Sequence, residues 1–179
     1  MTAIPASGSF AQRDDWITPR WITEAVLSGV PTMSWDLAAS RENTVCPFYF
    51  TEEDSFLDAE LWRLGASEAW MNPPFSKAKD FFSRCFSEKV AFVGIYKASN
   101  LETQTWELIL KNCDYLAIFK GRVPYVNPDT FETEPNVPFG SALIFFGIEK
   151  HRVVSIAKRL GCQLMKPVSL YSQFEMEML

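Results

Sequence analysis

Apolar residues recur along this chain in short continuous runs separated by segments of helical spacing. Four continuous runs predict strands that are buried on both faces, at residues 68–71, 90–96, 115–119 and 141–146. Two shorter candidate strands lie at residues 35–38 and 48–50. Helical spacing follows Thr18-Pro19, Ser76 and Asn100, each of which offers a helix start, and recurs near residues 57–64 and 150–160. The alternation predicts an α/β fold with a mostly parallel sheet and helices on both faces.

The length and composition suit one domain. The chain has 179 residues, of which 47% are apolar, and this is enough for a sizeable core. Residues 1–14 show little periodicity and are expected to form a flexible arm, so the domain is expected to occupy residues 15–179. Residues 121–140, rich in proline and asparagine, predict a long surface loop. We expect a soluble, intracellular protein, because no apolar stretch is long enough for a bilayer and no signal segment is visible.

The cysteines and the histidine give no metal signature. The four cysteines are scattered without paired spacing, and a single histidine accompanies them. This pattern argues against a zinc site and against a disulfide framework, and it favours reduced thiols in the cytoplasm.

Charge is unevenly distributed along the chain. The net charge is −5, yet residues 71–125 carry 8 basic and 5 acidic side chains, whereas residues 1–70 carry 4 and 11. A local basic segment is what polyanion binding requires, and a basic total is not needed. The same lysines and arginines could also be ordinary solvated charges.

The candidate chemistry lies in Asn72-Pro73-Pro74-Phe75, directly after a predicted strand. Ligands in α/β proteins gather at the carboxyl ends of strands. A residue that precedes proline is confined to extended geometry, which restricts Asn72, and a proline with fixed φ presents its carbonyl rigidly. Asn72 adds a side-chain oxygen and Phe75 a flat apolar face. The alternative interpretation is that this segment is only a structural turn between a strand and a helix.

Two fixed acceptors beside an aromatic ring suit a planar heterocycle with an exocyclic amine. Both N–H bonds of the amine can point at the two oxygens while the ring stacks on Phe75. The amine lone pair is normally delocalised, and acceptors that favour a pyramidal nitrogen localise it for attack. Positive charge that develops on the nitrogen strengthens the same hydrogen bonds, which is preorganised electrostatic catalysis.

Several ordered segments resemble the phage-type, Dam-like DNA N6-adenine methyltransferases. "DDWITP" at 14–19 resembles the opening of that family, and "WDLAAS" at 35–40 its abbreviated cofactor motif. "CPFYFTEEDSF" at 46–56 and "MNPPF" at 71–75 resemble two further family segments. "ETQTW" at 102–106 and the stretch from 119 to 146 are similar to later ones. The resemblance covers residues 14–147 and implies a single-domain Rossmann-like fold that uses S-adenosylmethionine.

The resemblance also implies roles for individual residues. Asn72, Pro73, Pro74 and Phe75 would form the catalytic element that holds the target adenine. Cofactor contacts would come from the residues that match the family segments: Trp16, Thr18, Pro19, Asp36, Ala38, Ala39, Ser40 and Asp54. Asp36 would accept from the cofactor's ammonium or from a bridging water, and Asp54 from its adenine amine or a ribose hydroxyl. Thr18 and Asp54 could instead be helix caps.

The implied substrate is adenine in double-stranded DNA. A pocket at a sheet edge cannot reach an adenine amine inside a duplex, so the base would be flipped out. Candidates for gripping the DNA are Lys77, Lys97, Lys120, Arg122 and Asn136, with the segment 121–140 as a DNA-contacting or lid element. Lys97 departs from the family, which tends to have a Leu-Pro-Ala-like strand end there. A phage or prophage product acting in the bacterial cytoplasm is implied, with no metal and no membrane.

Two other functions fit parts of the pattern. A methyltransferase acting on RNA or on protein glutamine shares the Asn-Pro-Pro-aromatic element, although Phe75 favours a flat base over an aliphatic amide. A catalytically silent binding protein of the anti-restriction type could use the same fold. The intact Asn72 and Phe75 argue against the silent protein.

Overall fold

The computed structural model describes residues 14–167 and shows a seven-stranded sheet with helices on both faces. The strands of this sheet are β1 (Trp35–Asp36), β2 (Phe48–Tyr49), β3 (Ala69–Met71), β4 (Phe92–Lys97), β5 (Tyr115–Ile118), β8 (Ser141–Phe146) and β9 (Gln163–Met165). The helices are α1 (Arg20–Gly29), α2 (Ala78–Ser87), α3 (Gln104–Asn112), α4 (Lys150–Arg159) and the 3-10 helix η2 (Leu61–Leu64). The predicted arm lies outside the described residues except for Asp14.

The strand order is β2-β1-β3-β4-β8-β5-β9. Neighbouring strands from β2 to β4 pair in parallel, whereas β8 runs antiparallel to β4 and β5, and β9 antiparallel to β5. Five strands therefore point one way and two the other. The mixed α/β architecture with a mostly parallel sheet and helices on both faces, predicted from the alternation of patterns, is confirmed.

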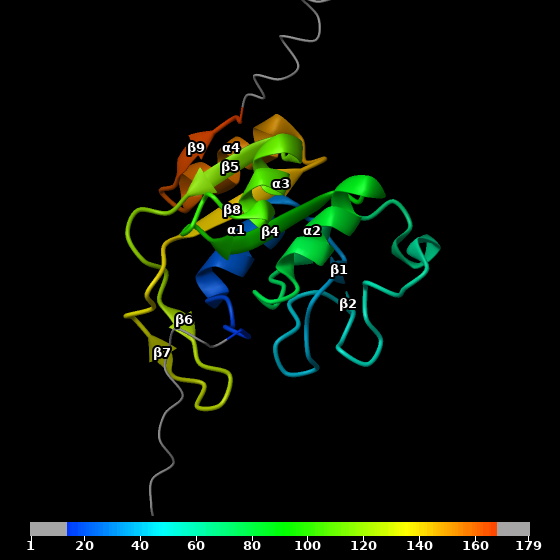
Figure 1. Cartoon of the computed structure of the whole chain (residues 1–179), viewed down its shortest axis with the longest axis horizontal. Coiled ribbons are helices and arrows are strands. Elements are labelled where there is room, and N and C mark those ends of the chain that lie inside the picture. The colour runs from blue at the N-terminus through cyan, green and yellow to red at the C-terminus, as the bar shows by residue number, and fades with distance from the viewer. Residues whose placement is uncertain (1–13, 168–179) are drawn as a thin grey trace, which may run out of the picture.

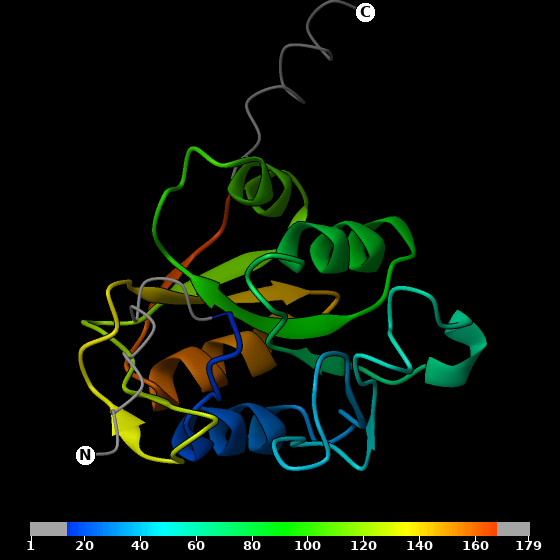
Figure 2. The same ribbon diagram turned by 60° about the horizontal axis from the view of Figure 1, so that its bottom comes forward.

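Successive side chains of the central strands point to opposite faces of the sheet and pack into two hydrophobic cores, one on each face. Val93 and Ile95 of β4 pack with α1 and α4, whereas Phe92 and Tyr96 pack with α2 and α3. Figure 2 shows the two helix pairs on opposite faces of the sheet. Because both faces are covered, β4 and β8 need apolar residues at nearly every position, which explains their continuous runs.

The helix starts differ from those expected. Thr18, Ser76 and Asn100 were the expected caps, but the residues that precede α1, α2 and α3 are Pro19, Lys77 and Thr103. The Thr103 side chain accepts from the backbone N–H of Trp106, so it caps α3. Asn100 instead adopts a positive φ of 55°. The hydroxyls of Thr18 and Ser76 are engaged by more distant partners in the site described below.

The segment 121–140 contains a small ribbon. Strands β6 (Tyr125–Val126) and β7 (Thr133–Glu134) pair antiparallel, and Val126 also bridges to Ile17. The ribbon therefore lies against the chain segment that enters α1 (Figure 1). Within residues 14–167, no helix is both long and apolar enough to cross a membrane.

Candidate active site

The site lies where the strand order of the sheet reverses direction. From β1 the chain moves to β2 on one side, and then returns to β3 on the other side. The carboxyl ends of β1 and β3 are therefore neighbours, with Asp36 opposite Trp70 in parallel register. Asp36 ends β1, and Asn72 follows directly after β3. A crevice at such a switch point is the usual ligand site of an open α/β sheet.

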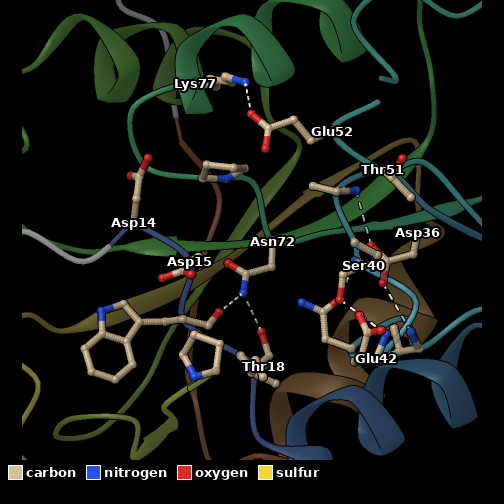
Figure 3. A pocket seen from close by; sticks show the side chains of 18 of the residues that line it. Asp14, Asp15, Thr18, Asp36, Ser40, Glu42, Thr51, Glu52, Asn72 and Lys77 are labelled. Atoms are coloured by element: carbon tan, nitrogen blue, oxygen red, sulfur yellow. Dashed lines mark hydrogen bonds and ion pairs between the residues drawn. The ribbon is translucent and has the colours of Figure 1, made fainter. Parts of the chain in front are cut away.

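The amide of Asn72 is held in one orientation. Its Nδ2 donates to the Trp16 carbonyl at 2.7 Å and to the Thr18 hydroxyl at 3.0 Å, as Figure 3 shows. A carbonyl can only accept, so the nitrogen must be the atom that faces Trp16. Within residues 14–167, no donor contacts the Asn72 side-chain oxygen. Asn72 therefore presents a free acceptor.

The two prolines differ in their use. The Pro74 carbonyl accepts from the Lys77 backbone N–H at 3.0 Å, which starts the turn into α2. In the described part of the chain, nothing donates to the Pro73 carbonyl. Pro73 is buried and Pro74 half-buried, so the loop has little freedom. Asn72 and Pro73 thus offer two acceptors on adjacent residues.

A strap formed by residues 14–18 holds this loop. The Asp14 carboxylate accepts from the backbone N–H of Ser76 at 2.8 Å and from the Ser76 hydroxyl, and the Asp14 carbonyl accepts from Phe75 at 3.3 Å. Together with the Asn72 contacts to Trp16 and Thr18, these bonds fix the loop from residue 72 to residue 76. The expected capping role of Ser76 is replaced by this contact.

Asp36 is a buried carboxylate at the floor of the site. It is 2% exposed, and its two oxygens accept from the backbone N–H groups of Ala38 at 3.3 Å and Val45 at 3.2 Å. Burial raises the pKa of Asp36 to about 7, and the two backbone hydrogen bonds oppose the shift. A cation placed beside this carboxylate would favour its ionised form.

A cavity of about 880 Å³ opens between the end of β1 and the Asn72 loop. Its lining includes six carboxylates against two basic side chains; these are Asp14, Asp15, Asp36, Glu42, Glu52 and Glu53 against Arg41 and Lys77. Lys77 and Glu52 form an ion pair of 3.2 Å that joins the start of α2 to the turn after β2 (Figure 3). The cavity therefore suits a ligand with positive charge.

Most of the expected cofactor residues line this cavity. Those that do are Trp16, Thr18, Asp36, Ala38, Ala39 and Ser40, together with Asn72, Pro74 and Lys77 from the other groups. Pro19 is buried at the start of α1 and does not line it. Asp54 is exposed, and both its oxygens accept from Arg63, at 2.9 and 2.7 Å. The side-chain hydrogen bond from Arg63 lowers the pKa of Asp54.

The expected DNA contacts are more widely spread. Lys120, Arg122 and Asn136 are exposed on the segment between β5 and β8 and lie outside the cavity lining. Lys97 ends β4, and its Nζ lies 4.7 Å from the centre of the Phe75 ring. Phe75 itself is half-buried against Tyr96 and Phe139 and does not line the cavity.

Sequence reasoning missed part of the lining. Asp14, Asp15, Asn43, Glu52 and Glu53 had no assigned role. Their positions carried a signal, because Glu52 and Glu53 follow a strand at the same sheet edge as Asp36. Asn43 accepts from the Ser40 backbone N–H at 2.7 Å and shapes the loop after β1. No group of three metal-ligating side chains is found in residues 14–167.

Comparisons with known proteins match this chain to one family and to two phage proteins. The family described as DNA N-6-adenine-methyltransferase (Dam) matches residues 7–163. A DNA N-6-adenine-methyltransferase of Haemophilus phage HP1 (strain HP1c1) is 26% identical over 149 residues, which cover 73% of this chain and 84% of that protein. A DNA N-6-adenine-methyltransferase of Escherichia phage T1 is 31% identical over 78 residues, which cover 44% of this chain and 32% of the phage T1 protein.

Proposed function

The chain belongs to the DNA N-6-adenine-methyltransferase (Dam) family, and we propose that it transfers a methyl group from S-adenosylmethionine to a flipped adenine held by Asn72, Pro73 and Phe75. Family membership makes it a DNA adenine methyltransferase, and methyltransferases of this kind use S-adenosylmethionine. It also favours DNA over the RNA and protein substrates that the motif alone allows. The residue roles and the site-specific, base-flipping mode of action are the proposal.

We propose a single-domain, Rossmann-like methyltransferase fold; the expected domain of residues 15–179 extends past the described residues, which end at residue 167. The support is the parallel half of the sheet, β2-β1-β3-β4, with its ligand cavity at the switch point between β1 and β3. The loop after β1 carries Ala38 and Ala39, whose small side chains leave the cavity wall open where other folds of this kind use glycine.

The residues of the cavity fit S-adenosylmethionine. When bound, this cofactor supplies an electrophilic methyl on a positively charged sulfonium, and it also carries an ammonium. The excess of carboxylates in the lining matches these two cationic groups. Asp36 would accept from the ammonium or from a bridging water, with Trp16, Thr18 and Pro19 bordering the methionine end and Ala38, Ala39 and Ser40 the loop. Asp54 is proposed as an acceptor for the adenine amine or a ribose hydroxyl, and this would require it to release Arg63.

The free acceptors of Asn72 and Pro73 carry the proposal. Because both Asn72 N–H bonds are used by Trp16 and Thr18, its oxygen can accept one N6 hydrogen, and the Pro73 carbonyl can accept the other. The N6 lone pair would form the new bond to the methyl group, and the sulfur of the bound donor would keep the electron pair of the broken carbon–sulfur bond. Positive charge builds on N6, the two acceptors stabilise it, and one N6 proton leaves to solvent.

The test is methyl transfer to unmethylated DNA by purified protein and variants. Asn72→Ala and Phe75→Ala are expected to lose at least a hundredfold in transfer while S-adenosylmethionine affinity, measured by calorimetry, stays within about threefold. Phe75→Tyr should retain activity because it keeps the ring. Asn112→Ala is a matched control, since that amide donates to its own helix at Leu108. Full activity in Asn72→Ala would refute the proposed roles.

A further inference from the structure

An ammonium lies over the ring that is proposed to stack the flipped adenine. The Lys97 Nζ is 4.7 Å from the centre of the Phe75 ring, within the range of a cation–π contact. Within residues 14–167, no carboxylate forms an ion pair with Lys97. Within the described residues, the Lys97 ammonium therefore contacts the Phe75 ring and forms no ion pair.

Both partners are held in place by the core. The Lys97 carbonyl accepts from the buried indole N–H of Trp106 at 3.1 Å, and Lys97 pairs with Ser141 at the end of the β4–β8 ladder. The Phe75 ring packs nearly perpendicular to Tyr96 and Phe139, with ring centres at 5.8 and 5.2 Å. Only the four-carbon stem and ammonium of Lys97 are free to leave the ring.

We propose that Lys97 caps the Phe75 ring in the DNA-free protein and exchanges with the target adenine, its ammonium then moving to a phosphate beside the flipped nucleotide. The inference rests on the proposed function, and it adds a displacement step and a defined role for Lys97. A base that stacks on the face of the ring covered by the ammonium could not occupy that face together with it.

The relative strengths of the contacts allow this exchange. A part-exposed cation–π contact contributes roughly two- to fivefold to an equilibrium. Stacking of a base on an aromatic ring contributes roughly five- to a hundredfold, so adenine displaces the lysine. The displaced ammonium regains a partner in the DNA backbone, and release of a counterion makes that contact dependent on salt.

The charge of the surroundings supports this direction of approach. The cavity on the Asn72 side is lined by an excess of carboxylates, which repel a phosphate backbone. Lys97 lies outside that lining, and within residues 14–167 no carboxylate forms an ion pair with it. Lys97 therefore offers a phosphate next to the flipped nucleotide an ammonium outside the carboxylate-rich lining.

The test compares Lys97→Met, which keeps the stem but removes the charge, with Lys97→Arg, on unmethylated genomic DNA at several salt concentrations. Lys97→Met is expected to raise KM for DNA about tenfold, leave kcat within about twofold, and reduce the slope of log kcat/KM against log salt by about 0.9. Lys97→Arg should restore KM and slope. Lys158→Met, in the last turn of α4, is the matched control and should behave as wild type.

An unchanged salt slope in Lys97→Met, or a lower KM, would overturn the exchange, because a lysine that only obstructs the ring would improve binding when truncated. Those results leave methylation by the wild type intact and so leave the proposed function standing. If the wild type transfers no methyl group to DNA, the proposed function fails and the exchange fails with it.

Discussion

We expect the buried carboxylate of Asp36 to make the binding of S-adenosylmethionine dependent on pH. Its pKa is raised from 3.8 to about 7 by burial, so ionising it in the cofactor-free protein costs about 4 kcal/mol relative to an exposed aspartate. If the cofactor's ammonium binds the ionised form, affinity rises as pH rises through 7. Between pH 6 and pH 7.5 the ionised fraction, and with it the affinity, increases about eightfold. Above that range the ligand's own ammonium begins to lose its proton.

The free protein should show the opposite trend in stability. A carboxyl whose pKa is raised on folding contributes stability that is present at low pH and is lost as pH rises through the folded-state value. We therefore expect the free energy of unfolding without cofactor to fall between about pH 4 and pH 7, with cofactor binding recovering part of the loss at the upper end. Asp36→Asn removes the titration and should flatten both profiles.

The measurement is calorimetric titration with S-adenosylmethionine from pH 6 to pH 7.5, paired with urea unfolding over pH 4 to 7.5. Asp36→Asn should bind weakly with no pH dependence in this window, because an amide cannot become charged. Glu107→Gln, an exposed change on α3, should reproduce the wild-type profile. A wild-type affinity that stays constant across the window would show that Asp36 does not face the ammonium.

Three further changes probe the site and its support. Glu52→Gln should weaken cofactor binding about fivefold and Asp54→Asn by less, because Glu52 lines the cavity while Arg63 holds Asp54; calorimetry that ranks them the other way would place Asp54 in the site. Thr18→Val should lower methyl transfer about tenfold, and Thr18→Ser should restore it, because the Asn72 amide needs the hydroxyl acceptor; equal rates in both would dismiss this contact. Tyr125→Phe should lower the free energy of unfolding by about 1–3 kcal/mol in urea, because its buried hydroxyl bonds Ser141 at 3.0 Å; an unchanged midpoint would mean that water replaces the bond.

The central strands were predictable because each of them is a continuous apolar run in the sequence. The run at residues 141–146 matches β8 in full, and β4 differs from the run at 90–96 by two residues at its start and one at its end. Both strands are covered on two faces, so nearly every position must be apolar. The place of Asn72 directly after a strand was also predictable, because ligands gather at the carboxyl edge of such a sheet, whereas the pairing of β1 with β3 was not predicted.

The helix caps could not be predicted because distant partners took the capping side chains. Thr18 accepts from Asn72, 54 residues away, and Ser76 donates to Asp14, 62 residues away. The preference of Thr and Ser for helix N-caps depends on neighbouring residues alone. It contains no information about the contact between residues 14–18 and the loop at residues 72–76. The pairing of Asp54 with Arg63 escaped for the same reason, since Arg63 belongs to a short 3-10 helix with weak periodicity.

Charge and geometry together separate the routes of the two substrates. The cavity beside Asp36 has an excess of carboxylates, which favours a cationic donor over DNA. Phe75 stands outside that lining with a lysine on its ring. Asn72 lines that cavity, with its amide nitrogen fixed by the strap and its oxygen free. We therefore expect donor and base to enter from different sides, so that the methyl group would lie between the donor sulfur and N6 of the base, as an in-line transfer requires.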